Sequence, residues 1–384
     1  MVDFASIGSL IERKRIKGKS IDDDAPIYAV TNTKGFVLSD SMHDFSVYSE
    51  DTSNYNVVTK NDFAYNPSRL NIGSIAYFDE DAKGLISPMY VVFHADEKKV
   101  STQYLFVVLK SQNVRNKIES LKEEGARFRF DFNRWDLIQI PIPSLEEQER
   151  IVGILDTFTA SIDNIKAQIE QRRKQYEHYR NTLLTFSKDD DSVEWKTLED
   201  IFELRNGYTP SKANSEFWTD GTIPWFRMED IRDKGRILSD SYLHITESAI
   251  KGKGLFKANS FILATTATIG EHALLIADSL ANQQFTNLKI RKSLINNIDI
   301  KFMFYYMFVV DEFCKSHTNV SGFASVDMNA LKRMAIPIPS LARQQEIVST
   351  LDTFEASITN LEAQLEQRQK QYEYYREELL TNLS

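Results

Sequence analysis

The chain has 384 residues, a single cysteine and a formal net charge of −9 at pH 7. Its length predicts two or more domains, because a single core rarely serves more than about 250–300 residues. The lone Cys314 excludes a disulfide framework and a thiolate metal cluster, and favours a reducing cytoplasm. We expect no signal peptide, because MVDFASIGSLIERKR at 1–15 lacks a long apolar core. We expect no membrane partner, because the most apolar window, residues 302–310, is about half of a ~20-residue membrane span.

The net negative charge argues at first against a nucleic-acid partner, which normally leaves a basic footprint. Residues 1–140, however, carry 18 basic and 20 acidic side chains, and residues 195–340 carry 17 and 16. The acidic excess therefore lies outside these two stretches, and a nearly neutral domain can still present one basic face. The composition permits DNA binding without showing it.

Residues 1–139 are expected to form a first mixed α/β domain. Within it, the sequence NDFAYNPSRLNIG at 61–73 combines apolar alternation with Asn, Pro and Gly, which is typical of a strand followed by a turn. The same stretch holds four polar turn residues, and a basic cluster comes before it. These residues are Asn66, Ser68, Arg69 and Asn71 in the turn, and Arg13, Lys14, Arg15, Lys17 and Lys19 in the cluster.

Residues 140–187 are expected to form a long helix. The sequence IPIPS supplies an extended start, and Ser144 can cap the first turn. Apolar residues then recur every three or four positions, as in the seam of a coiled coil, with Arg172 at one seam position. The predicted seam contains Leu155, Phe158, Ile162, Ile165, Ile169, Tyr176, Tyr179 and Leu183. If residues 145–186 are helical, this element is roughly 60 Å long.

Residues 188–335 form a second expected domain, which resembles the first only faintly. NSFILATTATIG at 259–270 matches residues 61–73, and NQQFTNL at 282–288 matches SPMYVVF at 87–93. Each of these segments has the pattern of a strand, a polar turn and a strand. We therefore expect two related domains in which polar loops project from a small sheet.

Residues 336–384 repeat the long helix. The segment 336–381 is identical to 140–185 at 31 of 46 positions, at a constant offset of 196 residues. Ser340 takes the capping position and Arg368 the polar seam position. The remaining seam residues are Leu351, Phe354, Ile358, Leu361, Leu365, Tyr372, Tyr375 and Leu379. Because both stripes belong to one chain, pairing within the chain should outcompete association between chains, and an antiparallel pair is the simpler geometry.

The alternation of two differing domains with two matching helices resembles the specificity subunits of type I restriction-modification systems over essentially the whole chain. IPIPSLEEQERIVGILD is similar to the family's opening of the first helix, and WKTLEDIFELRNGYTPSKANSEFWTDGTIPW to its domain start. Residues 1–10 lack the tryptophan that opens the second domain at Trp195, so we expect a shortened start of the first domain.

The resemblance implies a fold of the α+β class, with two target-recognition domains and two antiparallel coiled-coil helices. It implies a non-catalytic subunit that reads an asymmetric bipartite target in double-stranded DNA. The partners implied are modification (methyltransferase) subunits, two by expectation, and restriction or translocase subunits. S-adenosylmethionine and ATP would bind those partners, and this chain would hold no cofactor. The outer helix faces, including Arg173, Lys174 and Arg180, are candidate docking surfaces.

The residues themselves supply no catalytic constellation. Gly18-Lys19-Ser20 imitates the end of a phosphate-binding loop, but Arg13 stands where its first glycine is required. The six histidines show no metal-ligand spacing, so we expect no metal site. Two carboxylate-x-lysine fragments, at 81–83 and 97–99, lack the further acid that a nuclease metal site needs.

Base edges are read by Arg, Lys, Asn, Gln and Ser on projecting loops. The turn residues and the basic cluster of the first domain are therefore candidate DNA contacts, and surface solubility and turn formation are equally good explanations for them. Trp218, Trp225 and Phe226 are expected in the core. The candidates in the second domain are Arg205, Lys212, Asn214, Arg227, Lys251, Lys253, Thr265, Thr266, Asn282, Gln283 and Gln284.

Two other functions fit the same sequence. One is the DNA-reading subunit of a related type II restriction system whose partner fuses methylation and cleavage. The other is a coiled-coil scaffold whose domains bind protein. The scaffold is disfavoured by two non-identical domains at equivalent positions and by the Gly-x-Thr-Pro and Ile-Pro-Trp patterns at 207–210 and 223–225.

Overall fold

The structure is a computed structural model, and it describes residues 3–20, 25–41, 51–121, 128–319 and 324–383. The chain divides into two compact units. Unit 1 comprises Met1–Ala167 and Glu362–Ser384, and unit 2 comprises Gln168–Leu361. Each unit therefore contains one globular part and portions of both long helices. The domain boundaries expected from the sequence stay a prediction.

The globular part of unit 1 is built on two four-stranded sheets, with strand orders β2-β9-β6-β7 and β4-β3-β8-β5. Their strands are β2 (Ile11–Lys14), β3 (Ile27–Thr31), β4 (Gly35–Leu38), β5 (Asn56–Thr59), β6 (Phe63–Tyr65), β7 (Ile75–Tyr77), β8 (Lys83–Ile86) and β9 (Val91–Ala95). Two short helices, α1 (Thr102–Lys110) and α2 (Gln112–Ser120), follow β9. A separate pair, β1 (Asp3–Ser6) and β10 (Gln139–Ile142), joins the start of the domain to its end.

Aromatic side chains fill the core of unit 1. Phe63 of β6 and Phe93 of β9 stack with their ring centroids 4.9 Å apart. Tyr65 meets Trp135 edge to face at 5.8 Å, and Phe130 packs on the same indole at 4.6 Å. All five rings are fully buried. The alternation at 61–73 thus produced a buried β6 and a turn to β7, as the sequence predicted.

Unit 2 contains a five-stranded sheet of order β12-β19-β16-β17-β14 and a three-stranded sheet of order β15-β13-β18. Their strands are β12 (Phe202–Asn206), β13 (Ile223–Phe226), β14 (Ile237–Leu238), β15 (His244–Ile245), β16 (Ser260–Ala264), β17 (His272–Leu275), β18 (Leu280–Ala281) and β19 (Phe285–Ile290). Strands β11 (Glu194–Thr197) and β22 (Ala335–Ile338) pair separately, as do β20 (Thr318–Asn319) and β21 (Ser325–Val326). The helices of the globular part are α4 (Leu198–Ile201), α5 (Met228–Lys234), α6 (Ile300–Ser316) and α7 (Met328–Arg333).

The two globular parts share one strand plan. In unit 1 the order β2-β9-β6-β7 corresponds to β12-β19-β16-β17 in unit 2, and β6-β7 and β16-β17 are both antiparallel hairpins. The faint match between 61–73 and 259–270 therefore reflects a real structural equivalence. The segments 87–93 and 282–288 also correspond, but each is a turn followed by one strand, so the expected strand-turn-strand pattern was wrong there.

The first domain does not begin in a shortened form, which corrects the expectation from its missing tryptophan. Strand β1 is four residues long, like β11, and pairs in the same register with its closing strand. Phe4 faces Pro141, and Trp195 faces Pro337. Because Pro141 and Pro337 are matching repeat positions, Phe4 occupies the place of the tryptophan.

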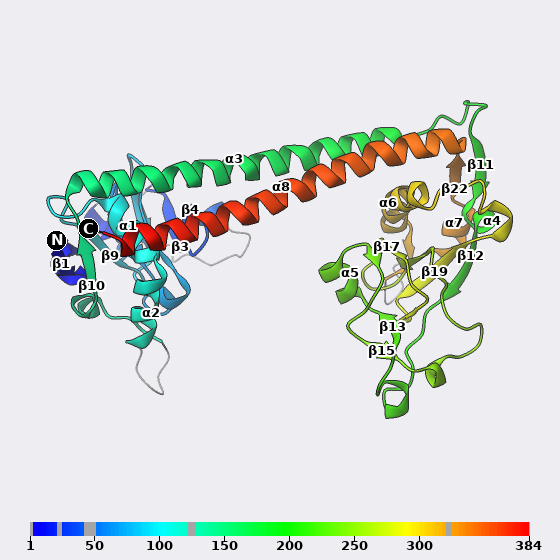
Figure 1. Cartoon of the computed structure of the whole chain (residues 1–384), viewed down its shortest axis with the longest axis horizontal. Helices are drawn as coiled ribbons and strands as arrows, with labels where there is room; N and C mark the ends of the chain where they lie inside the picture. Colours follow the sequence, from blue (N-terminus) through cyan, green and yellow to red (C-terminus); the bar gives the residue numbers. More distant parts are fainter. Residues whose placement is uncertain (1–2, 21–24, 42–50, 122–127, 320–323, 384) are drawn as a thin grey trace. The chain divides into compact units, whose positions relative to one another are not determined.

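The repeated segments form the two long helices, α3 (Leu145–Leu183) and α8 (Leu341–Thr381). Both predicted caps are present, since the Ser144 hydroxyl accepts a hydrogen bond from the Glu147 amide and the Ser340 hydroxyl accepts one from Arg343, each at 3.3 Å. Helix α3 ends at Leu183, three residues before the expected end at Phe186. Within each unit a stretch of α3 packs antiparallel to a stretch of α8 (Figure 1).

The helix seam has the same contacts in both units. In unit 1, Phe158 lies 5.2 Å from the Tyr375 ring and beneath the Arg368 guanidinium at 5.7 Å. In unit 2, Phe354 lies 5.1 Å from Tyr179 and beneath Arg172 at 5.7 Å. These residues match across the offset of 196 residues, so the predicted antiparallel seam and its two polar positions are confirmed. A guanidinium over an aromatic face is attracted by the ring quadrupole, which explains how arginine is accommodated in an apolar seam.

No helix of the described part of the chain is long and apolar enough to cross a membrane.

Candidate nucleic-acid interface

Polar side chains gather in unit 2 where the β12, β16 and β18 strands end. The Thr209 hydroxyl donates to Oε1 of Gln283 at 2.6 Å. Asn282 accepts from the Gln284 amide at 3.0 Å, and its side-chain amide donates to Oε1 of Gln284 at 3.2 Å. The Thr265 amide donates to the Gln284 carbonyl at 2.9 Å. We call Thr209, Thr265, Asn282, Gln283 and Gln284 the polar loop cluster.

The polar loop cluster brings together residues that are far apart in sequence. Gln283 is exposed and Asn282 and Gln284 are half-buried, whereas Thr265 is buried beneath them. Thr265 therefore supports the cluster from below, and both groups of the Asn282 side-chain amide are bonded to Gln284. The Gln283 amide lies where a base edge could meet it. Asn and Gln side chains pair with adenine through one donor and one acceptor, which gives this cluster a reading chemistry. Thr266 is half-buried and bridges to Ser325.

A hollow of about 410 Å³ lies in unit 2 between Lys212, Trp218, Trp225 and Arg227. The two indole rings meet edge to face at 5.0 Å, and their N–H groups donate to the Ser211 and Tyr208 carbonyls at 3.1 and 3.0 Å. Trp225 and Phe226 are buried, as expected, and Trp218 is half-buried. The hollow therefore presents two cationic side chains beside an aromatic wall.

Arg227 and Asn214 make local contacts at this hollow. Nε of Arg227 lies 3.2 Å from a Glu229 carboxylate oxygen, and about a third of the arginine side chain is exposed. Oδ1 of Asn214 accepts from the Glu216 amide at 3.1 Å, which caps a turn at 215–217. The Arg227 guanidinium is thus positioned at the surface, whereas the Asn214 side chain is engaged in turn formation.

A glycine-containing loop presents Lys251 and Lys253 on the surface of unit 2. Gly252 and Gly254 have φ angles of 61° and 77°, in the left-handed region that favours glycine. The Lys251 amide donates to the Tyr208 hydroxyl at 2.8 Å. Both lysine side chains are exposed. The loop is therefore held in one conformation that directs two ammonium groups toward solvent, as a phosphate contact requires.

Arg205 lies beneath this lysine loop. Its guanidinium donates to the Gly254 carbonyl at 2.6 Å and covers the Phe256 ring at 4.5 Å. Burial lowers the pKa of this guanidinium, because an apolar environment disfavours the charged form. The contacts of Arg205 indicate that it supports the loop.

The basic cluster of the first domain divides into supporting and exposed residues. Lys14 donates to the Thr59 hydroxyl at 2.7 Å and to the buried Asp62 carboxylate, with which it forms an ion pair. Lys17 donates to Oδ1 of Asn56 at 2.7 Å. The structure therefore ties these two ammonium groups to the domain itself.

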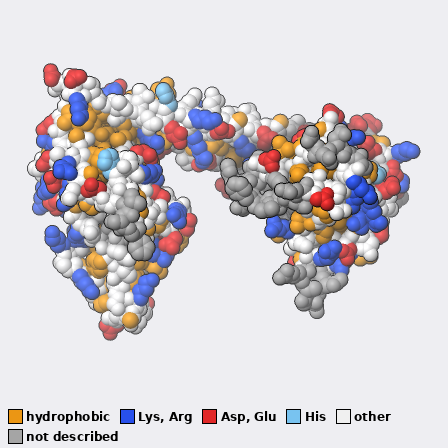
Figure 2. Space-filling view, turned by 180° about the vertical axis from the view of Figure 1, so that it is seen from behind, with side chains coloured by type: hydrophobic (Ala, Val, Ile, Leu, Met, Phe, Trp, Pro, Cys, Tyr) orange, Lys and Arg blue, Asp and Glu red, His pale blue; other side chains and the backbone are white. Residues whose placement is uncertain are grey.

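Arg13, Arg15 and Lys19 remain exposed in the first domain. The Arg13 guanidinium lies 5.9 Å from the Phe132 ring centroid. These three residues are the members of the basic cluster that present charge to solvent. Over both units, Lys and Arg side chains are interspersed with Asp and Glu, so the face in view is not uniformly basic (Figure 2).

The polar turn of the first domain has mixed roles. Oδ1 of the buried Asn66 accepts from the Ser68 amide at 2.9 Å, which is the turn chemistry expected of asparagine. Ser68 and Arg69 are exposed, and Asn71 is half-buried in a short turn at 70–72. Ser68 and Arg69 are therefore the accessible candidates in this turn.

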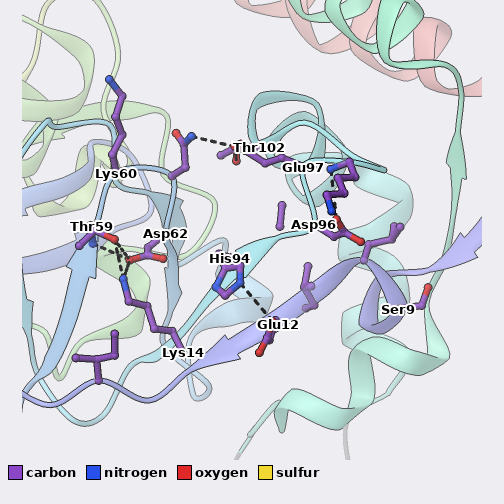
Figure 3. A pocket seen from close by; sticks show the side chains of 16 residues that line it. Ser9, Glu12, Lys14, Thr59, Lys60, Asp62, His94, Asp96, Glu97 and Thr102 are labelled. Carbon is purple, nitrogen blue, oxygen red and sulfur yellow. Dashed lines mark hydrogen bonds and ion pairs between the residues drawn. The ribbon is translucent and has the colours of Figure 1, made fainter.

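The first domain also has a larger hollow, of about 1030 Å³, beside β2 and β9 (Figure 3). Carboxylates of Glu12, Asp62, Asp96 and Glu97 line it. His94 lies 3.6 Å from Glu12, and Glu97 accepts from the Thr102 hydroxyl at 2.9 Å. Lys14, Lys60 and Lys98 line the same hollow, and Lys14 pairs with Asp62, so its charge is mixed and it does not present the basic surface that a phosphate backbone attracts.

Two further sequence expectations concern metal binding and the outer faces of the long helices. Among the described residues no group of three or more His, Cys, Asp or Glu side chains could hold a metal ion, and His43 lies outside those residues. The placement of Arg180 on an outer helix face was wrong, because its guanidinium covers the Phe308 ring of α6 at 4.3 Å. Lys174 does face solvent, paired with Glu170 at 2.6 Å.

Thr209 was missed among the sequence candidates, although it holds the exposed Gln283. The signal that could have found it is the Gly-Tyr-Thr-Pro segment at 207–210, which was noted only as a family pattern. In the structure the Gly207 and Tyr208 amides donate to Phe285 and Ala281 carbonyls at 2.8 and 2.9 Å. This segment therefore lies against the polar loop cluster.

Comparison with known proteins gives the class of this architecture. The family model described as "Type I restriction modification DNA specificity domain" matches residues 3–172 and 191–370. Two solved chains have the same fold at 16% identity. One is the HsdS subunit from Thermoanaerobacter tengcongensis, with a TM-score of 0.55 over 99% of this chain and 97% of that one. The other, from work on complex assembly and conformational transition of the type I R-M system, has a TM-score of 0.69 over 99% and 98%.

Curated relatives agree with the family model. The EcoR124I/EcoR124II specificity subunit of Escherichia coli is 32% identical over 384 residues, covering 95% of this chain and 89% of the relative. The EcoprrI specificity subunit of Escherichia coli is 50% identical over 200 residues, and this match spans 49% of this chain and half of the relative. The chain belongs to the type I restriction-modification specificity subunits, which are DNA-recognition subunits and not catalysts.

Proposed function

We propose that this chain reads an asymmetric bipartite DNA target, with one half-site bound by each globular part. The single observation that carries the proposal is the pairing of a common strand plan with different loops. Strand orders β2-β9-β6-β7 and β12-β19-β16-β17 correspond, yet the exposed candidates are Arg69 and Arg15 in one part and Gln283 and Lys212 in the other. Different donors and acceptors select different base edges, so two unlike half-sites are expected.

In the same proposal, helices α3 and α8 hold the two recognition domains at a fixed distance, and we call this helix pair the frame. The seam contacts of Phe158 and Phe354 are equivalent in the two units, which supports a common frame for the two recognition domains. Base pairs between the half-sites would be left unread, and the frame would set their number. The exposed helix faces, which include Lys174, are the surfaces proposed to dock modification subunits, one for each half of the frame.

The chemistry of modification and restriction is assigned to partner subunits. S-adenosylmethionine and ATP would bind there, and this chain would act in the cytoplasm without a cofactor of its own. The modification subunits would carry methyl transfer, and the restriction subunits translocation and cleavage. A type II partner that fuses methylation and cleavage would place the same DNA-reading role in a different assembly.

Mapping of methylated positions in the host genome tests the proposal. Cells that express the chain with its modification partner should carry methylated bases in one asymmetric motif with two unlike halves and a fixed unread spacer. The purified complex should bind a duplex with that motif, with an affinity that falls steeply as salt rises, because phosphate contacts release counterions. An uninterrupted or symmetric motif would contradict the bipartite reading, and absence of salt-sensitive duplex binding would favour a protein scaffold.

A further inference from the structure

A glutamine is fully buried in the first turn of each long helix. Gln148 in α3 and Gln344 in α8 are both 0% exposed and occupy matching repeat positions. Each lies on the apolar stripe of its helix, since Gln148 precedes the buried Ile151 and Leu155 by three and seven residues. A buried amide at a helix position that normally holds an apolar side chain needs all of its hydrogen bonds to be satisfied.

Gln148 meets this requirement through three main-chain groups. Its Nε2 donates to the Lys99 carbonyl at 3.0 Å and to the Pro143 carbonyl at 2.9 Å. Its Oε1 accepts from the Ser101 amide at 2.9 Å. Ser101 is the N-cap of α1, where its hydroxyl accepts from the Tyr104 amide at 3.2 Å. One side chain therefore joins the start of α3 to the start of α1 in the first recognition domain.

Gln344 makes the same three contacts in unit 2. Its Nε2 donates to the Asn297 carbonyl at 2.9 Å and to the Pro339 carbonyl at 2.8 Å. Its Oε1 accepts from the Asp299 amide at 2.7 Å. Asp299 is the N-cap of α6, so the second joint links a long helix to the capped helix of the second recognition domain. The residues around the two glutamines differ, but the geometry of the two joints is the same.

The chemistry of these joints fixes orientation as well as contact. An apolar contact tolerates sliding, because burial has no preferred direction, whereas hydrogen bonds weaken steeply when distance and angle change. Both amide donors and the acceptor of each glutamine are used, and all partners belong to the main chain. A domain could not tilt on its helix without breaking at least one of these bonds.

We propose that Gln148 and Gln344 are positioning residues that hold each recognition domain in one orientation on its helix, and so enforce one spacer length between the half-sites. The inference rests on the bipartite reading described above. Neither glutamine touches DNA in this scheme, since both are enclosed by protein. They act through the domains that they hold.

The test replaces each glutamine with methionine, which has a similar volume and no amide. In the complex with the modification partner, methylation rates are measured on the native target and on targets with one base pair added to or removed from the spacer. We expect both Gln148→Met and Gln344→Met to lower the preference for the native spacer by about tenfold, as the loss of directional bonds permits tilting. The half-site sequences should stay the same.

Matched controls are the exposed Gln171→Met and Gln367→Met, which lie on α3 and α8 at equivalent repeat positions. They should leave spacer preference unchanged. A purely structural role of the buried glutamines would lower methylation on all targets in parallel and leave the ratio between them unaltered. That outcome, or equal effects of the exposed substitutions, would overturn the proposal.

A second measurement examines the joint without DNA. Spin labels at Lys34→Cys and Ala160→Cys, in a full-length chain with Cys314→Ala, report the distance between the first domain and its helix. Gln148→Met should broaden this distance distribution, whereas Gln171→Met should leave it unchanged. An unchanged distribution in Gln148→Met would overturn the role of the joint.

The two measurements also separate failure of this inference from failure of the proposed function. If the unsubstituted complex shows no spacer preference, the bipartite reading fails, and the label distances still decide whether Gln148 orients the domain. Should circular dichroism show that Gln148→Met has lost its helical fold, Gln148→Asn serves as the second variant. It keeps a neutral amide but is one methylene shorter, so it cannot reach the Lys99 carbonyl, the Pro143 carbonyl and the Ser101 amide together, and the same loss of spacer preference is expected.

Discussion

The attachment of each recognition domain to its helix can be compared with the loops that project from the same domain. At the attachments, Gln148 and Gln344 bind the same three kinds of main-chain group. On the strands that carry these loops, corresponding places carry different chemistry. Lys14 at the end of β2 pairs with Asp62, whereas Arg205, in the same register on β12, donates to a carbonyl and covers Phe256.

This difference indicates that the contacts that hold the domains on the helices are separate from the surface that meets DNA. Contacts to main-chain groups do not depend on the identity of neighbouring side chains, so a joint built from them works in two domains of different sequence. Loop side chains contact each other, so changing one alters what the loop presents. The frame can therefore stay the same while the surface that meets DNA changes.

The largest effect is expected from exchanging a whole recognition domain. Replacing residues 195–335 with the corresponding domain of another specificity subunit should change one half-site completely and leave the other unaltered. The reason is that the exchanged segment contains the polar loop cluster, whereas α3 and α8 are retained. Mapping of methylated motifs in cells that express the chimera with its partner measures this. Changes in both half-sites would show that the two domains do not read independently.

A change in the helix pair should alter the spacer and neither half-site. Deleting one heptad from each helix, residues 162–168 and 358–364, preserves the seam phase because seven residues complete its repeat. Each helix shortens by roughly 10 Å at about 1.5 Å per residue, which corresponds to ~3 base pairs if helices and duplex run parallel. The accompanying change in DNA rotation, about 100°, is expected to weaken binding.

The methylated motif of the double-heptad deletion measures the spacer directly. An unchanged spacer with full activity would show that the helices do not set the distance. A four-residue deletion from each helix is the control, since it shifts the seam phase and should damage packing between α3 and α8.

A smaller and uniform effect is expected from the lysine loop. Replacing Lys251 and Lys253 with glutamine should weaken duplex binding equally for all sequences, because phosphates carry no sequence information. The slope of log K against log salt should fall by about 2, close to one per phosphate contact. Binding titrations at several salt concentrations measure this slope. Lys166→Gln on α3 is the control, and a loss of base preference in the loop variant would contradict a phosphate role.

The smallest effect is expected at a hydrogen bond between α3 and α8 that is present in unit 2 and that the matching residues of unit 1 cannot make. The Tyr176 hydroxyl donates to Glu355 at 2.9 Å. Burial raises the pKa of Tyr176, and the Glu355 carboxylate raises it further, because both disfavour the phenolate. Tyr176→Phe should therefore lower the free energy of unfolding by about 1 kcal/mol. Tyr372→Phe, at the matching position of α8, should change it less, since Thr159 stands where α3 would need a counterpart of Glu355. Denaturant unfolding of both variants compares them, and equal losses would contradict the asymmetry.

The sequence alone determined the frame of this protein. The repeat of 46 residues and its three- and four-residue apolar spacing predicted two long helices with a shared seam, and the contacts of Phe158 and Phe354 confirm it. Such a pattern is local, because each residue of the stripe is defined by neighbours three or four positions away. The family resemblance likewise depended on short segments, at 140–156 and 195–225, that can be recognised without a structure.

The candidate site could be predicted only in part. Among the basic residues picked from the sequence, Lys251 and Lys253 are exposed on a loop, whereas Lys14 and Arg205 are held inside their domains. The partners of those two, Asp62 and Gly254, lie 48 and 49 residues away along the chain. Local composition gives no information about such partners, so it could not distinguish a supporting cation from a free one.

Only the tertiary structure decided which polar residues hold the frame together. Gln148 binds main-chain groups 47 and 49 residues away, Gln344 binds others 45 and 47 residues away, and Arg180 covers a ring on α6. In the sequence the spacing of Gln148 and Gln344 from the apolar stripe places them on its face, but it does not reveal the main-chain groups that they bind. Their role arises because folding brings the start of each long helix against the capped helix of a recognition domain, where a buried amide has to find every one of its partners.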